Sequence, residues 1–297
     1  MKEYYEVKPG ADALRYLVSY GLLTMLARRA RKRPNRLFVE ISSNIDRHIL
    51  SEGLFEKGLL DLLRDFCLQT GHTGLMIDVG ANIGNHTVAL ASVFKRVEAV
   101  EPHPVLFRVL QANTLYNHLM HVRCHNFGLA NENTSGTLTA SPDNHAMNRV
   151  RERSQLAPEI VGLTNEQFSD EFPIELLSAR EFIGQFASEL DRTFIKIDVE
   201  GMEQEIITAI EPLLREHKPL VGFEWFTKSQ PELTQIVCNI PGYEVWVIRV
   251  HDSGGSYLWR AFKMLFRGRS YTLERLNPAN LDDVYPLALL VPTSPKR

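Results

Sequence analysis

Two spacings of apolar residues divide this chain into predicted helices and strands. A helical spacing covers residues 13–29, and a second covers residues 59–67. Three short apolar runs without alternation follow at residues 75–79, 194–198 and 220–224. Such runs are typical of strands in a parallel sheet that is covered on both faces, and we take residues 75–79 as the central strand.

The rest of the pattern alternates strands with helices, which predicts a Rossmann-like α/β fold with a parallel sheet. The expected strands lie at residues 75–79, 97–101, 122–126, 194–198, 220–224, 243–250 and 287–291. The expected helices between them lie at residues 85–93, 104–117, about 200–210 and 231–240. We therefore expect a seven-stranded, mostly parallel sheet with helices on both faces and an antiparallel last strand.

The predicted domain boundaries follow from where this alternation holds. Residues 1–50 form an N-terminal helical extension, and residues 51–297 form one domain with an insertion at about residues 130–180. Within the insertion, residues 136–140 and 173–177 are expected to pair as a small antiparallel elaboration.

Composition narrows the class of protein. The 297 residues are 44% hydrophobic and 23% charged, which fits a globular enzyme and argues against a solenoid or a disordered chain. Cys67, Cys124 and Cys238 lie far apart without a CxxC pair, so neither a zinc ribbon nor a disulfide framework is expected.

No signal peptide is predicted, because the N-terminal basic cluster follows the apolar stretch instead of preceding it. We expect a cytoplasmic protein.

Positive charge is concentrated near the N-terminus. Residues 1–36 hold nine Lys and Arg against three Asp and Glu, although the net charge of the whole chain is −3. Residues 28–33 and 259–267 combine basic with apolar or aromatic side chains, which is compatible with contact at a membrane surface. We favour docked helices with a solvated basic face, and neither segment approaches the roughly 20 apolar residues that span a bilayer.

The first candidate for chemistry is the segment DVGANIG at residues 78–84, which leaves the central strand and enters a helix. Doubly wound folds bind ligands at this position, and glycines let the backbone approach them. A dinucleotide fingerprint has its second glycine, which meets the pyrophosphate, where this chain has Asn82. S-adenosylmethionine has no phosphate, and its ammonium suits an acidic side chain such as Asp78. The motif therefore favours S-adenosylmethionine over a nicotinamide cofactor.

Glu101 ends the next strand about 20 residues further on, where a carboxylate can accept both ribose hydroxyls. By itself Glu101 is equally compatible with a surface carboxylate followed by Pro102, which stops the strand. In combination with the glycine motif, we assign Glu101 to the ribose.

Three segments together resemble the FkbM family of methyltransferases. They are IDVGANIGNHTVALA, VEAVEPHPVLFRVLQANTLYN and FIKIDVEGMEQEII, and they frame roughly residues 54–226. The resemblance implies a Rossmann-like class I methyltransferase domain that uses S-adenosylmethionine, commonly for O-methylation of sugar or natural-product hydroxyls. By position it implies contacts to the methionine part, the ribose and the adenine edge, made respectively by Asp78, Gly80, Asn82 and Gly84, by Glu101, and by Asn126 and Gly128.

Two carboxylates after the strand at residues 194–198 are candidate catalytic groups. Asp198 and Glu200 project from the strand end toward the crevice where the methyl group should lie, and one of them could act as a base. They could equally cap the following helix, whose N-terminus favours anions, and the two roles are compatible. Glu224 ends the next strand and could complete a magnesium site with them. Because acidic strand ends are common and no histidine or cysteine cluster accompanies these, we expect no metal.

Three histidines lie near these motifs, and imidazole is the commonest general base near neutral pH. His103 follows Glu101 closely and is expected to shape the adenosine pocket. His86 opens the helix after the glycine motif and is placed toward solvent. His145 lies in a predicted loop that could cover the acceptor, and it is our third candidate catalytic residue.

The leading hypothesis is an enzyme that methylates a hydroxyl of a sugar, a glycan or a small natural product. A non-catalytic S-adenosylmethionine-binding module would keep the glycine motif and Glu101 but have no acceptor pocket. A nucleic-acid methyltransferase could use the basic N-terminus, but the remainder of the chain is acidic and we expect no nucleic-acid partner. A nicotinamide dehydrogenase is the remaining alternative for this fold. The sequence leaves the acceptor and the oligomeric state open.

Overall fold

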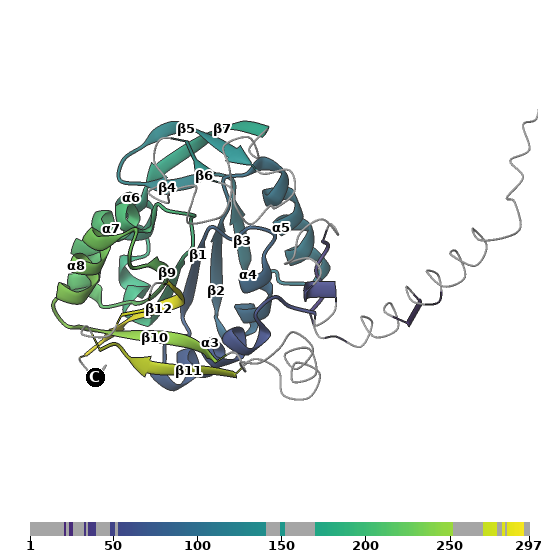
Figure 1. Cartoon of the computed structure of the whole chain (residues 1–297). Helices are drawn as coiled ribbons and strands as arrows, with labels where there is room; N and C mark the ends of the chain where they lie inside the picture. The colour runs from purple at the N-terminus through teal and green to yellow at the C-terminus, as the bar shows by residue number, and fades with distance from the viewer. Residues whose placement is uncertain are drawn as a thin grey trace, which may run out of the picture.

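The structure is a computed structural model that describes most of the chain after residue 52. The described residues are 53–140, 149–151, 170–251, 270–277, 281–282 and 284–293, with residues 21, 24–25, 33, 35–39 and 48–50 before them. Within these residues, eight strands form one large sheet in the order β11-β10-β12-β9-β8-β1-β2-β3 (Figure 1). They are β1 (Leu75–Val79), β2 (Arg96–Val100), β3 (Val122–His125), β8 (Thr193–Ile197), β9 (Leu220–Phe226), β10 (Tyr243–His251), β11 (Ser270–Arg275) and β12 (Val284–Pro292).

The strand directions confirm a mostly parallel sheet with an antiparallel edge. β1 pairs in parallel with β2 and β8, and the sheet continues in parallel to β3 and β9. β12 pairs antiparallel with β9 and β10, and β11 pairs antiparallel with β10. We predicted seven strands, and the additional one is β11. This edge strand mixes polar and apolar residues and has no continuous apolar run, so the residue pattern does not predict it.

The order of the strands creates a crevice beside β1. The chain runs from β1 outward to β2 and β3, and then returns to β8 on the opposite side of β1. The connections after β1 and β8 therefore leave the sheet in opposite directions. In open α/β sheets, ligands bind at such a switch point, outside the carboxyl ends of the strands.

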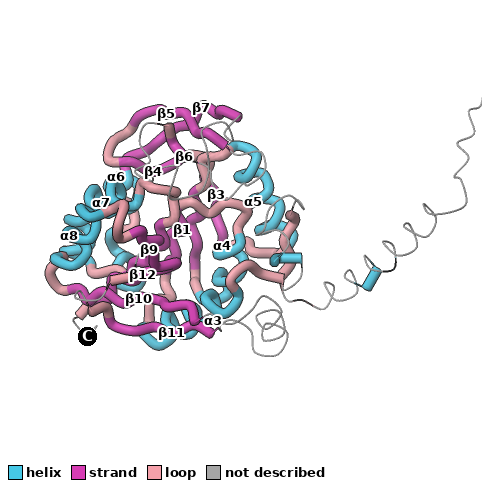
Figure 2. Tube along the Cα trace, viewed as in Figure 1, coloured by secondary structure: helices cyan, strands magenta, loops and turns pink. Residues whose placement is uncertain are grey.

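Helices cover both faces of the large sheet (Figure 2). They are α3 (Lys57–Thr70), α4 (Asn85–Leu90), α5 (Pro104–Tyr116), α6 (Ala179–Gly184), α7 (Glu203–His217) and α8 (Pro231–Asn239). Successive side chains of β1 point to opposite faces. Ile77 packs in a core with α6, α7 and α8, whereas Met76 packs in a second core with α3 and the residues after α4. Asp78, two residues after Met76, therefore lies on the face covered by α3 and α4.

Helix α7 begins later and ends later than predicted from the sequence. We expected it at about residues 200–210, and it covers Glu203–His217. Glu200 and Gly201 have φ angles of 53° and 104°, so this turn is left-handed and cannot belong to the helix. The helix then continues through Pro212, because Ile210 and Leu214 on either side of it are buried against the sheet.

A smaller sheet lies above the carboxyl ends of the central strands (Figure 1). Its strands are β4 (Gly128–Ala130), β5 (Thr134–Ala140), β6 (Arg149–Val150) and β7 (Asp170–Ser178), in the order β4-β7-β5-β6. β5 and β7 pair antiparallel with Gly136 opposite Ile174, which confirms the pairing predicted for residues 136–140 and 173–177. Leu138 and Leu176 belong to the small core of this sheet.

Some N-terminal residues are bound to the domain by asparagine side chains that pair with the backbone. The N–H of Phe38 donates to Asn113 Oδ1 at 2.6 Å. The N–H of Phe55 donates to Asn85 Oδ1 at 2.9 Å, and Asn85 Nδ2 donates back to the Phe55 carbonyl at 3.1 Å. The helix predicted at residues 13–29 lies largely outside the described residues.

Candidate active site

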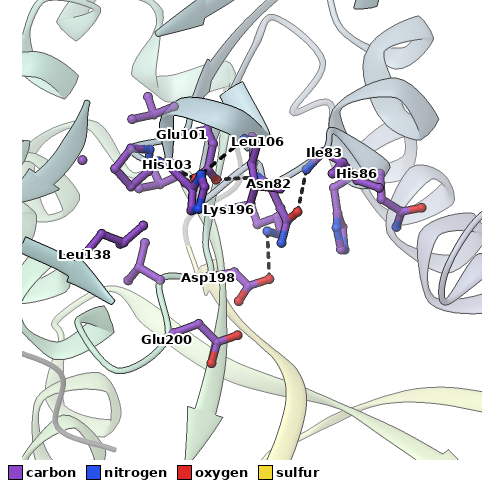
Figure 3. Close-up of a pocket in the computed structure, with 18 of the residues that line it drawn as sticks. Asn82, Ile83, His86, Glu101, His103, Leu106, Leu138, Lys196, Asp198 and Glu200 are labelled. Carbon is purple, nitrogen blue, oxygen red and sulfur yellow. Dashed lines mark hydrogen bonds and ion pairs between the residues drawn. The ribbon is translucent and has the colours of Figure 1, made fainter. Parts of the chain in front are cut away.

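A cavity of about 750 Å³ opens at the switch point of the large sheet (Figure 3). The carboxyl ends of β1, β2, β8 and β9 supply one side of it, and Leu138, Phe172 and Leu176 of the small sheet supply another. Phe38 and Phe55, from the N-terminal part, also line it. Elements far apart in the sequence therefore enclose one space.

The glycine turn forms one wall of the cavity. Gly80 has a φ of 78°, and a Cβ atom built on it would lie 1.8 Å from the carbonyl oxygen of Asp198. Gly84 has a φ of 91° and precedes the first residue of α4. Asn82 is also left-handed, with a φ of 53°. The two glycines are therefore required by the backbone, and Gly80 lets the end of β1 touch the end of β8.

The backbone N–H groups of this turn are all used inside the protein. Those of Gly80 and Ala81 both donate to the Val100 carbonyl at 3.0 Å, and that of Gly84 donates to the Ala81 carbonyl at 2.9 Å. The N–H of Asn82 donates to Glu101 at 2.7 Å, and that of Ile83 donates to Asn82 Oδ1 at 2.7 Å. A dinucleotide site instead directs such amides at a pyrophosphate. This arrangement argues against a nicotinamide cofactor.

Glu101 lies at the end of β2 with both carboxylate oxygens fixed. One oxygen accepts from Asn82 N and the other accepts from His103 N, at 2.7 and 2.8 Å. Burial raises the pKa of Glu101 to about 7, against the lowering effect of these two hydrogen bonds. Each oxygen keeps further lone pairs, and the side chain lines the cavity, as the ribose assignment requires.

His103 has a structural role in addition to lining the cavity. Its Nδ1 accepts hydrogen bonds from the backbone of Val105 and Leu106, at 3.1 and 3.4 Å, and so caps the N-terminus of α5. Its ring lies against Phe172 of β7, with ring centroids 4.3 Å apart. His103 thus connects the end of β2 to the small sheet.

The two residues predicted at the adenine edge are placed differently. Gly128 lines the cavity. Asn126 is absent from the described cavity wall, and its Nδ2 donates to the carbonyls of Glu101 and Pro102 at 3.0 and 3.1 Å. Asn126 therefore holds the backbone that carries Glu101.

Asp78 and Gly84 are likewise absent from the described wall, although the sequence predicted that they contact the ligand. Asp78 is fully buried beneath the turn, because the alternation of β1 points it at α4. Thr87 Oγ1 of α4 donates to Asp78 Oδ2 at 2.6 Å, and the ammonium of Lys196 lies 3.4 Å from Asp78 Oδ1. Of the four residues assigned to the methionine part, Gly80 and Asn82 reach the cavity.

Asp198, Glu200 and Glu224 come together beside the carboxyl ends of β8 and β9, and all three line the cavity. One carboxylate oxygen from each lies within 4.8 Å of the other two. Figure 3 shows Asp198 and Glu200 on the same side of the space, with Lys196 beside Asp198. Lys196 Nζ donates to Asp198 Oδ2 at 3.1 Å. The geometry thus assembles the three strand-end carboxylates that the sequence indicated.

The environment divides these carboxylates into two kinds. Burial alone would raise the pKa of Asp198, but the Lys196 ammonium outweighs burial and holds that pKa below its ordinary value. Burial, with Asp198 nearby, raises the pKa of both Glu200 and Glu224 well above the ordinary value. Asp198 is therefore held as an anion, whereas the environment of Glu200 and Glu224 favours their protonated forms.

The alternative in which Asp198 and Glu200 cap the following helix is wrong. Helix α7 begins at Glu203, and its N-cap is Met202, which makes no side-chain hydrogen bond. The buried Glu203 itself accepts the N–H groups of Val199 and Gly201, at 3.0 and 3.1 Å. This leaves the carboxylates of Asp198 and Glu200 directed at the cavity.

His86 was placed toward solvent, and that prediction is also wrong. The side chain lines the cavity, and burial together with the Lys196 charge lowers its pKa to about 4. It is therefore a neutral imidazole at neutral pH. His145, the third candidate catalytic residue, lies outside the described residues, as do residues 28–32 and 259–267.

Lys196 lines the cavity but was not among the site residues predicted from the sequence. It is 2% exposed, within a strand whose residues are all buried. A charged side chain in such a strand requires buried counter-ions. That signal was present in the segment FIKID and could have identified it.

None of the helices within the described ranges has the length and apolar character needed to cross a membrane.

Known proteins resemble this chain in sequence and in structure. A protein named Methyltransferase 1 from Beauveria bassiana (strain ARSEF 2860) is 27% identical over 147 residues, which cover 46% of this chain and 58% of that protein. The chain thus matches little more than half the length of this relative. The crystal structure of methyltransferase FkbM from Methylobacillus flagellatus KT is 18% identical, with a TM-score of 0.41, and the alignment covers 95% of this chain and 60% of that one. A precorrin-6y C5,15-methyltransferase from Geobacter metallireducens GS-15 is 16% identical, with a TM-score of 0.38 and coverages of 80% and 91%.

The family is established by a match over a long continuous segment. Residues 78–244, more than half of the 297-residue chain, match the family model described as the methyltransferase FkbM domain. This segment contains the glycine turn, Glu101, Lys196 and the three clustered carboxylates. The chain belongs to the FkbM family of methyltransferases.

Proposed function

We propose that this methyltransferase uses S-adenosylmethionine to methylate a hydroxyl group of a sugar, a glycan or a small natural product. The observation that supports this most strongly is one cavity lined by two kinds of group. Glu101 and the glycine turn form the first, and the carboxylates of Asp198, Glu200 and Glu224 form the second. The first suits a ribose and a cofactor without a pyrophosphate, and the second offers proton acceptors.

The residues of the cavity fit S-adenosylmethionine by their chemistry. Glu101 would hold the ribose hydroxyls, Gly80 and Asn82 would lie along the methionine part, and Gly128 would lie near the adenine. Because the amides of the glycine turn are used internally, this wall suits a cofactor without a pyrophosphate. When bound, the cofactor supplies a methyl group on a positively charged sulfur.

Methyl transfer to a hydroxyl is an in-line displacement, in which the oxygen–carbon bond forms as the carbon–sulfur bond breaks. The hydroxyl proton must leave, and we assign it to Glu200. A carboxylate with a raised pKa is the stronger proton acceptor, and Asp198 is held as an anion by Lys196. The cavity walls would also accelerate the transfer by aligning the acceptor oxygen with the methyl group.

A first experiment separates the cofactor site from the reaction. Isothermal titration with S-adenosylhomocysteine measures binding, and transfer of a tritiated methyl group to a panel of sugars, glycans and hydroxylated natural products measures turnover. Absence of binding would contradict the proposal. Binding without transfer to any hydroxyl acceptor would support the non-catalytic module instead.

A second experiment tests Glu200 as the base. We expect Glu200→Gln to lower kcat by a factor on the order of 10² to 10⁴, with little change in affinity for S-adenosylhomocysteine. In the wild type, the rate should rise with pH through the raised pKa of Glu200, because the acid must lose its proton before it can accept another. Glu216→Gln, on the exposed side of α7, is the matched control and should keep the wild-type rate.

A further inference from the structure

Lys196 forms an ion network that joins carboxylates at the ends of two neighbouring strands, β1 and β8. Its Nζ lies 3.1 Å from Asp198 Oδ2 and 3.4 Å from Asp78 Oδ1. Asp78 is at the end of β1 beneath the glycine turn, and Asp198 follows the end of β8 and lines the cavity. One ammonium therefore holds a carboxylate buried beneath the glycine turn and a carboxylate of the cavity wall.

The register of β1 and β8 directs the Lys196 side chain toward Asp78. Lys196 is paired with Asp78 in the parallel register of β1 and β8, so both side chains point to the same face of the sheet. Thr87 Oγ1 occupies Asp78 Oδ2, and among the described residues Asp78 Oδ1 accepts no hydrogen bond. The ammonium is thus the counter-ion on that side of Asp78.

Lys196 remains charged despite its burial. Burial alone would lower its pKa, but the carboxylates of Asp198 and Asp78 raise the pKa above its ordinary value. The positive charge of Lys196 therefore offsets part of the negative charge of Asp78 and Asp198, beside the place where a cationic methyl donor would react.

We propose, building on the proposed function, that Lys196 is a positioning residue that fixes Asp198 and limits how strongly the site prefers the cationic methyl donor over its neutral demethylated product. The positive charge on sulfur is lost during transfer. A site that stabilised this charge too strongly would stabilise the ground state more than the transition state and would raise the barrier. Lys196 counteracts that effect and favours release of the positive charge.

The test compares the affinities of S-adenosylmethionine and S-adenosylhomocysteine, measured separately by isothermal titration. Lys196→Met removes the charge while keeping a flexible side chain of similar length. We expect the ratio of the two affinities to shift toward S-adenosylmethionine by a factor on the order of ten, together with a fall in kcat. Lys196→Arg should restore most of the wild-type ratio.

Asp198→Asn changes the local charge in the opposite direction and should shift the ratio toward S-adenosylhomocysteine. Lys218→Met is the matched control, because Lys218 Nζ binds the Pro241 carbonyl away from the cavity, and its ratio should equal that of the wild type. Circular dichroism establishes folding, and if Lys196→Met does not fold, Asp198→Asn decides the question.

A wild-type ratio in both Lys196→Met and Asp198→Asn would overturn the inference while leaving the proposed function intact. Failure of the wild type to bind either compound would overturn the proposed function itself. The two failures are therefore distinguishable without knowledge of the acceptor.

Discussion

At Gly80 the backbone leaves no room for any side chain. Its φ of 78° disfavours other residues, and an added Cβ would lie 1.8 Å from the backbone oxygen of Asp198. Because β1 and β8 are both buried, neither strand can move aside. We expect Gly80→Ala to lower the free energy of unfolding by more than about 3 kcal/mol, measured by urea denaturation.

Gly184→Ala is the control for that substitution. Gly184 is the last residue of α6, and an added Cβ would have no atom within 4 Å. Alanine favours a helix over glycine by about 1 kcal/mol, so this variant should be at least as stable as the wild type. Equal stability of the two variants would contradict the close approach of β1 and β8.

Glu101 makes stability depend on pH in a defined window. Burial raises its pKa from 4.5 to about 7, so between these values the folded chain holds a proton that the unfolded chain has released. The stabilisation from this proton is fully present below pH 4.5 and is lost as the pH rises through 7. The shift corresponds to about 3 kcal/mol.

The measurement is urea denaturation of the wild type and Glu101→Gln at pH 5 and pH 8. Glutamine does not titrate, so Glu101→Gln should become more stable relative to the wild type as the pH rises. A difference between the two proteins that stays constant with pH would show that Glu101 does not titrate in this range.

At the scale of elements, asparagine side chains attach the N-terminal residues to the domain. Asn113 is fully buried in α5, accepts the N–H of Phe38 at 2.6 Å and donates to the Ile83 carbonyl at 2.7 Å. It therefore links a residue that lines the cavity to the glycine turn. We expect Asn113→Ala to cost about 1–3 kcal/mol in unfolding free energy and to weaken binding of S-adenosylhomocysteine.

Asn117, the C-cap residue that follows α5, is the comparison. It pairs with the backbone of Arg36 in the same way, at 2.9 and 2.6 Å, but it is less buried and does not contact the turn. Asn117→Ala should cost less stability and leave the affinity for S-adenosylhomocysteine unchanged. An equal loss of affinity in both variants would mean that the attachment acts through the segment as a whole, and not through Ile83.

Elements with a strong local pattern were predictable from the sequence. The buried strands β1, β8 and β9 follow from runs of apolar residues, and the pairing of β5 with β7 follows from two short strand-like segments within the insertion. The start of α7 was misplaced because left-handed geometry at Glu200 is not visible in composition. β11 was missed because an edge strand with mixed residues has no continuous apolar run.

Residues of the site were predictable where spacing within one segment of the chain decides whether a residue reaches the cavity. Gly80 and Glu101 follow from the turn after a strand and from the end of the next strand. The cavity-facing position of His86, and the ion network of Lys196, depend on which strand lies beside β1. That neighbour, β8, is more than a hundred residues away in the chain, so local sequence does not specify the contact.

At the scale of the whole molecule, the cavity brings together parts of the fold that lie far apart in the sequence. Its walls come from both halves of the large sheet, from the small sheet and from the N-terminal residues. A ligand that contacts several of these parts binds the folded chain and has no equivalent site on the unfolded chain. Binding must therefore stabilise the whole domain, and not one element of it.

We accordingly expect S-adenosylhomocysteine to raise the melting temperature by several degrees. A ligand present at about 100 times its Kd stabilises the folded state by about 2.7 kcal/mol, and in a domain of this size each kcal/mol raises the melting temperature by roughly 2–4 °C. NAD should give no shift, because the amides of the glycine turn are already used within the protein. Glu101→Ala should reduce the shift produced by S-adenosylhomocysteine, since it removes the carboxylate assigned to the ribose. A shift with NAD and none with S-adenosylhomocysteine would reassign the cavity to a dinucleotide, because the chemistry of the bound compound, and not the fold, distinguishes these two uses of the same switch point.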